Sequence, residues 1–93
     1  MSGEILNIAG YRFIDLPDRD ELRESFLEFC TNLELRGTVL LSPNGINFFL
    51  AGPESRVRDF IDFLESDIRF TGIPIKSSYT VFQPFRRMLV KRK

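Results

Sequence analysis

The chain has 93 residues, of which 43% are hydrophobic and 28% charged, a composition typical of one soluble globular domain. It has no histidine and a single cysteine, Cys30, which excludes a conventional zinc site and the Ser-His-Asp and Cys-His classes of catalysis. No apolar run approaches the roughly 20 residues of a membrane helix, so we expect no membrane contact. A lone cysteine cannot form an internal disulfide, which favours a reducing cytoplasm.

The formal net charge of zero hides an uneven distribution. All 13 acidic residues lie between Glu4 and Asp67 together with six arginines, so that part carries −7. From Ile68 to Lys93 there are seven cations and no acid, so the second part carries +7. An asymmetry of this kind is typical of a chain that presents a basic surface to an anionic partner.

The first half of the chain predicts a strand, a helix and a hairpin. Residues 7–16 are short, β-branched and aromatic and run into Pro17, which predicts a strand ended by a turn. Residues 18–35 begin with acids and have apolar residues at helical spacing, which predicts a helix. In residues 37–52, Asn44-Gly45 lies between two apolar runs, and this is a strong hairpin signal.

The second half predicts another helix and a closing strand. Pro53 opens the helix, and its apolar face is formed by Val57, Phe60, Ile61 and Leu64. Gly72 and Pro74 then break the chain. Residues 75–82 are ambiguous, whereas residues 85–92 have the pattern of a strand.

The order strand, helix, strand, strand, helix, strand predicts one α+β domain over residues 1–93. This is the ferredoxin-like βαββαβ sandwich, with a four-stranded antiparallel sheet and two helices on one face. The ending PFRRMLVKRK, residues 84–93, is then the last strand, and a solvated tail is the least favoured alternative. Alternation places Met88 and Val90 against the helices and puts three cations on the other face: Arg87, Lys91 and Lys93.

The face of the sheet away from the helices has two interpretations. If Val39, Leu41, Phe48 and Leu50 face the helices, the residues that face outward are Leu40, Asn47 and Phe49. An exposed aromatic ring beside cations is how sheet-faced RNA binders stack bases. The alternative, which we favour for Leu40 and Phe49, is docking against a neighbouring domain or a second copy. The candidate nucleic-acid contacts are Arg86, Arg87, Lys91, Arg92, Lys93 and Asn47.

The residues with reactive side chains predict no catalytic site in this segment. Cys30 lies on the apolar side of its helix and in the second half of that helix, where it fills the core rather than acting as a thiolate. The helical acids lie opposite the apolar faces, which is typical of solvated surfaces. The glycines mark element boundaries, and none has the spacing of a phosphate-binding loop. We therefore expect no catalytic residue, no metal and no cofactor here.

Residues 37–64 resemble the second half of acylphosphatases, which have the same fold. The activity of that family depends on an arginine in the loop after the first strand and an asparagine in the second strand. Leu41 stands at the position that matches the asparagine, and IDLPDRD does not resemble the phosphate-binding loop. The resemblance therefore implies the fold and not the catalytic pair.

A closer resemblance extends over nearly the whole chain. YRFIDLPD, RGTVLLSPNGIN, AGPESRVRDFIDFL and PFRRMLVK are similar to blocks, in the same order, of the N-terminal domain of the rhodanese-related tRNA uridine hydroxylases. Members of that family continue into a rhodanese-like domain with the reactive cysteine and hydroxylate the wobble uridine of certain tRNAs with molecular oxygen. The chain departs from the family pattern at Asn44, which is usually acidic, and at Phe48 and Phe49, which are usually small.

The resemblance implies that this chain is the N-terminal part of a longer protein, with tRNA and a following rhodanese-like domain as its partners. The family's catalytic cysteine does not correspond to Cys30, which stands in a different setting. The leading hypothesis is an accessory domain of a tRNA-modifying enzyme, which helps bind tRNA or positions the catalytic domain. The alternative is a purely structural module that docks on its partner domain without touching RNA, and an acylphosphatase-type hydrolase is disfavoured by Leu41.

Overall fold

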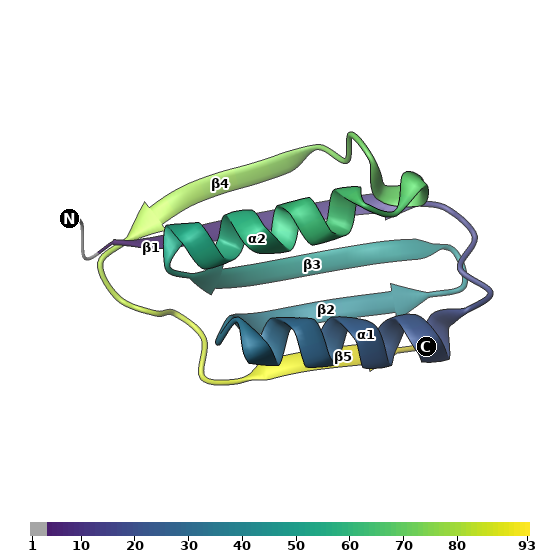
Figure 1. The fold of residues 1–93 in the computed structure, drawn as a ribbon, viewed down its shortest axis with the longest axis horizontal. Coiled ribbons are helices and arrows are strands. Elements are labelled where there is room, and N and C mark those ends of the chain that lie inside the picture. Colours follow the sequence, from purple (N-terminus) through teal and green to yellow (C-terminus); the bar gives the residue numbers. More distant parts are fainter. Residues whose placement is uncertain (1–3) are drawn as a thin grey trace.

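The computed structural model describes residues 4–93, and this part of the chain forms one sheet with two α-helices on one side. The elements are β1 (Ile5–Phe13), α1 (Arg19–Asn32), β2 (Arg36–Ser42), β3 (Gly45–Gly52), α2 (Glu54–Glu65), the 3-10 turn η1 (Ile68–Phe70), β4 (Ile75–Thr80) and β5 (Met88–Arg92). The strand order is β4-β1-β3-β2-β5, and both helices cover the same face (Figure 1). The ferredoxin-like α+β fold is confirmed.

The predicted number of strands is wrong, because residues 4–93 form five strands and not four. The fourth strand of the ferredoxin-like arrangement is β4, in the ambiguous segment 75–82, and it pairs antiparallel with β1. The closing segment forms β5, which pairs parallel with β2 at the opposite edge, so the sheet is mixed and not purely antiparallel. The chain crosses from one edge to the other through residues 81–87 at one end of the sheet (Figure 1).

The core lies between the helices and the inner face of the sheet. Helix α1 buries Phe26, and α2 buries Phe60, whose ring centroid is 6.1 Å from that of Phe26 and 5.5 Å from that of Phe48 on β3. Each buried phenylalanine contributes about 1.5–3 kcal/mol through removal of apolar surface from water. The four strand residues predicted to face the helices are fully buried, namely Val39, Leu41, Phe48 and Leu50.

The hairpin between β2 and β3 is confirmed, and its turn also fixes the chain that leaves β1. The backbone amide of Ile14 donates to the carbonyl oxygen of Asn44 at 2.9 Å. A Cβ atom on Gly45 would lie 2.1 Å from the carbonyl oxygen of Arg12, so this position requires glycine. The end of β1 is thereby held close to the start of β3.

Strand β5 is packed into the fold and is not a free tail. Val90 is 4% exposed and Met88 packs against the core, as predicted. Two arginines of α1 reach over the strand: Nε of Arg23 donates to the Val90 carbonyl at 3.0 Å, and Nε of Arg19 donates to the Lys93 carbonyl at 2.9 Å.

Candidate functional site

The face of the sheet that the helices leave uncovered, which we call the open face, carries a defined row of side chains. Tyr11 pairs with Asn47, Asn47 with Leu40, and Leu40 with Lys91, so the row crosses β1, β3, β2 and β5. Paired residues point to the same side of a sheet, and neighbouring strands lie about 4.8 Å apart, so this row spans about 14 Å. Leu40, Asn47 and Lys91 lie on this face as the alternation predicts.

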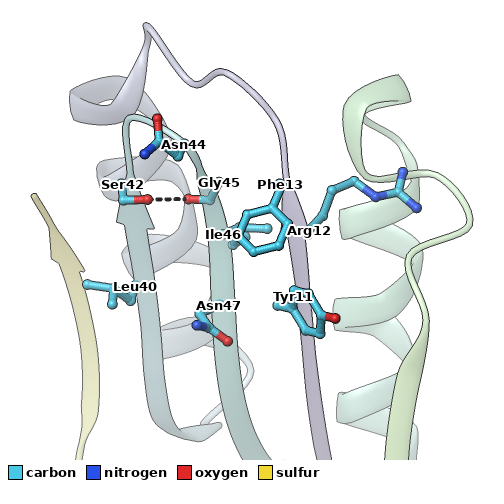
Figure 2. A pocket seen from close by; sticks show the side chains of 9 residues that line it. All are labelled: Tyr11, Arg12, Phe13, Leu40, Ser42, Asn44, Gly45, Ile46 and Asn47. Carbon is cyan, nitrogen blue, oxygen red and sulfur yellow. Dashed lines mark hydrogen bonds between the residues drawn. The ribbon is translucent and has the colours of Figure 1, made fainter.

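A hollow of about 230 Å³ lies on the open face where β1 ends and β3 begins (Figure 2). Phe13 is 83% exposed and Tyr11 is 59% exposed, and their rings meet edge to face with centroids 5.6 Å apart. Figure 2 shows the ring of Phe13 face-on, beside the start of β3. The sequence reading missed both rings, although alternation from the apolar Ile8 would have placed them on this face.

The amide side chain of Asn47 lies in the same hollow, next to Tyr11 (Figure 2). Within residues 4–93 this amide has no hydrogen-bond partner. The nearby Ser42 hydroxyl is engaged, because it donates to the Gly45 carbonyl at 3.3 Å. Asn47 therefore offers an amide donor and a carbonyl acceptor to a ligand.

The cations of the closing segment divide between the two faces of the sheet. Lys91 pairs with the outward-facing Leu40, and Lys93 is exposed two residues further along. Arg92 pairs with the buried Leu41, points to the helix side and forms an ion pair with Asp20 of α1. Among residues 4–93, Lys91 and Lys93 have no acidic partner, so their charges remain available to an anion.

Arg86 and Arg87 lie at the other end of β5, where a third arginine joins them. Both are exposed, and together with Arg36 of β2 and the acidic Glu34 they line an open hollow of about 660 Å³. The Arg87 carbonyl accepts from the Gly37 amide at 2.8 Å, which holds this segment at the start of β2. The sequence reading missed Arg36, because only the parallel pairing of β5 with β2 brings it here.

Phe49 lies on the open face beside a second hollow of about 240 Å³, which Tyr11, Asn47 and Lys76 also line. Phe49 is 53% exposed, and Leu40 on β2 is half-buried. Tyr11 and Asn47 border both hollows, so the aromatic surface is continuous across β1 and β3.

Two positions bear on catalysis. Cys30 is fully buried, and burial raises the pKa of its thiol to about 12, so it stays protonated and unreactive at neutral pH. Leu41, at the position of the acylphosphatase asparagine, is also fully buried and brings no polar group to the loop after β1. No helix in residues 4–93 is long and apolar enough to cross a membrane.

The architecture is that of a ferredoxin-like domain whose sheet has one uncovered, aromatic and basic face. The chain belongs to the family described as UPF0176 acylphosphatase like domain, whose model matches residues 5–93. A protein of Variovorax paradoxus named tRNA uridine(34) hydroxylase is 51% identical over 90 residues, which cover 97% of this chain and 34% of that protein. A protein of Cupriavidus necator with the same name is 47% identical, over 97% of this chain and 32% of its own length.

The chain therefore spans about a third of the length of these curated relatives. Among solved structures, the dark state of the BLUF protein BlrB superposes with a TM-score of 0.71 at 14% identity, over 95% of this chain and 73% of that one. At this identity the likeness shows the fold alone.

Proposed function

We propose that this chain is the accessory N-terminal domain of a tRNA-modifying enzyme and helps to hold the tRNA. A rhodanese-like domain outside this chain would hydroxylate the wobble uridine with molecular oxygen, in the cytoplasm. The observation that carries the proposal is the identity of about one half, over 97% of the chain, with relatives named tRNA uridine(34) hydroxylase. The buried, protonated Cys30 supports placing catalysis elsewhere.

The basic edge, which we define as Arg36, Arg86, Arg87, Lys91 and Lys93, supports contact with RNA. These side chains are not paired with acids in residues 4–93, whereas Arg92 is held by Asp20. From Arg87 to Lys93 the edge extends for about 20 Å, at about 3.3 Å per strand residue. Unpaired Lys and Arg along one edge are suited to successive phosphates of a nucleic-acid backbone.

The test is a titration of tRNA into the native chain and into the variant Arg87→Glu/Lys91→Glu at two salt concentrations. If about three phosphates are bound, a fourfold rise in salt weakens native binding roughly 20- to 40-fold, because the slope is near −0.7 to −0.9 per contact. The variant should bind more weakly and depend less on salt.

Arg56→Glu/Arg58→Glu on α2 is the matched control, because it changes the charge equally on the helix side of the fold. It should bind tRNA like the native chain, and circular dichroism checks that both variants fold. Equal tRNA affinity of the native chain and the Arg87→Glu/Lys91→Glu variant would contradict the proposal.

The apolar open face favours a second candidate function, a structural module that positions the catalytic domain without touching RNA. Phe49 is 53% exposed there and Leu40 lies on the neighbouring strand, so both could be covered by a partner domain. A native chain that does not bind tRNA even at low salt would favour this candidate.

A further inference from the structure

We propose that the hollow formed by Tyr11, Phe13 and Asn47 binds an unpaired nucleobase of the RNA. The ring of Phe13 stacks on the base, and the amide of Asn47 makes hydrogen bonds with the edge of the base. This inference rests on the proposed function, because it adds a base contact to the backbone contacts of the basic edge.

The location of the rings on the sheet is the first reason. Tyr11 and Phe13 lie on β1 and Asn47 lies on β3, and these are neighbouring strands in the interior of the sheet order β4-β1-β3-β2-β5. Sheet-faced RNA binders present aromatic side chains on a four-stranded sheet in the same way, and two or three splayed bases stack on them. Here the helices cover the other face, so a base can approach without displacing any element (Figure 2).

The surroundings of Phe13 leave its ring accessible to a planar ligand. Its partner on β3 is Gly45, which has no side chain to cover the ring, and a Cβ there is excluded by the Arg12 carbonyl. Tyr11 supports the ring from the side in an edge-to-face contact with an interplanar angle of 69°. The Phe13 ring is 83% exposed and yet held by its contact with Tyr11, so it presents a surface on which a base can stack.

The polar groups around the rings fit RNA better than a protein partner. The Asn47 amide has no partner in residues 4–93, and its donor and acceptor match the alternating carbonyl and N–H groups on a pyrimidine edge. Lys91 lies in the same row, about 14 Å from Tyr11, at a distance suited to the backbone that carries the base. The centres of protein interfaces are depleted of charged residues. Here Lys76 lines the adjoining hollow with Tyr11, and Lys91 lies at the far end of the row.

The experiment compares the affinity of the 93-residue chain for an RNA stem-loop with unpaired loop bases and for a blunt RNA duplex of equal charge. Phe13→Ala should weaken stem-loop binding about 5- to 150-fold, the range measured for loss of one base–aromatic stack. Duplex binding and the salt slope should not change, because the phosphate contacts are kept. Phe13→Trp, which keeps an aromatic ring at this position, should bind the stem-loop about as tightly as the native chain.

Phe82→Ala is the matched control, since Phe82 is 71% exposed but lies outside the hollow, in the segment before β5. It should leave stem-loop binding unchanged. A 5-iodouridine placed in the loop should photo-crosslink to Tyr11 or Phe13, and mass spectrometry identifies the peptide.

Two outcomes overturn the inference. If Arg87→Glu/Lys91→Glu weakens stem-loop binding but Phe13→Ala and Asn47→Ala do not, the proposed function stands and the hollow binds no base. If the native chain binds neither RNA, both the base site and the RNA-holding function fail.

Discussion

Arg69 is the residue that ties the turn after α2 to the start of α1. Its guanidinium donates to both carboxylate oxygens of Asp18, at 2.7 and 3.1 Å, and to Asp67 at 2.7 and 3.0 Å. Its carbonyl accepts from the side chain of Arg12 at 3.3 Å. Arg12 lies between Tyr11 and Phe13 and points the opposite way, so this network anchors β1 where the two rings emerge.

Replacement of Arg69 by methionine should destabilise the fold in a pH-dependent way. Hydrogen bonds from Arg69 hold the pKa of Asp18 and that of Asp67 below the usual 3.8, so both carboxylates are ionised in the native state. Because the pKa of each carboxyl is lower in the folded state than in the unfolded state, its interaction with Arg69 stabilises the fold fully above pH 3.8. This contribution to the free energy of unfolding is lost as the pH falls through the folded-state pKa values. We expect Arg69→Met to cost about 1 kcal/mol at pH 7, because Asp18 is 40% exposed and solvent screens the pair.

Urea unfolding of the native chain and of Arg69→Met at pH 7 and near pH 2 measures this contribution. The difference in unfolding free energy between the two proteins should shrink at the lower pH, where both carboxylates take up protons. Arg58→Met on α2 is the comparison, because Arg58 also lowers the pKa of Glu54 but this pair is more exposed, so its removal should change the pH dependence less. A difference for Arg69→Met that is the same at both pH values would show that packing, and not the ion pairs, matters at this position.

At the scale of elements, β5 is an edge strand, and its amides should exchange in an alternating pattern. The Arg87 carbonyl accepts a hydrogen bond from the Gly37 amide, and the Lys93 amide donates one to the Leu41 carbonyl, both at 2.8 Å. The backbone groups of the odd-numbered residues of β5 therefore point toward β2. In a parallel pair, every second residue of a strand hydrogen-bonds to the neighbouring strand through its backbone amide and carbonyl. We therefore expect slow hydrogen exchange at the amides of Leu89 and Lys91 and fast exchange at those of Val90 and Arg92. Uniformly fast exchange across Met88–Arg92 would mean that the strand is not stably paired.

The sequence predicted the helices and the hairpin because each has a strong local signal, but it did not predict the number of strands. Strand β4, IKSSYT, is an edge strand with four exposed residues in its centre, so no apolar alternation marks it. Strand β5 does alternate, and a four-stranded fold needs only one closing strand, so the pattern places β5 where β4 lies in the structure. Which edge a strand joins depends on the connection and the pairing partner, and local periodicity does not specify these.

The candidate site was predictable where it depends on alternation within a strand. The outward placement of Asn47, Phe49 and Lys91 follows from the apolar residues beside them in sequence. The ion pair of Arg92 with Asp20 and the approach of Arg36 to Arg87 depend on tertiary packing and on the parallel register of β5. The sequence analysis counts Arg92 among the candidate nucleic-acid contacts, and its pairing with Asp20 follows only from the packing of α1 against β5.

At the scale of the whole molecule, the charge asymmetry of the sequence is carried into the fold only in part, because Arg69 and Arg92 of the basic part pair with acids of the first part. Helices α1 and α2, which carry acidic residues, cover one face of the sheet (Figure 1), whereas Lys91 lies on the open face. An RNA would therefore be attracted to one side and repelled by the other, which orients it before contact. Helix α1 packs beside β5, so its acids oppose the approach more strongly than those of α2.

Neutralising two acids of α1 should therefore speed association with RNA and leave dissociation unchanged. We expect Glu24→Gln/Glu28→Gln to raise the association rate constant about two- to fivefold at low ionic strength, since long-range charges act mainly on encounter. The effect should fade at 0.15 M salt, where the Debye length is about 8 Å. Asp59→Asn/Asp62→Asn on α2 makes the same charge change farther from β5 and should act more weakly. Stopped-flow measurement with a labelled stem-loop gives the association and dissociation rate constants. If both double variants raise the association rate constant equally, or if only the dissociation rate constant changes, the charge arrangement does not orient the RNA.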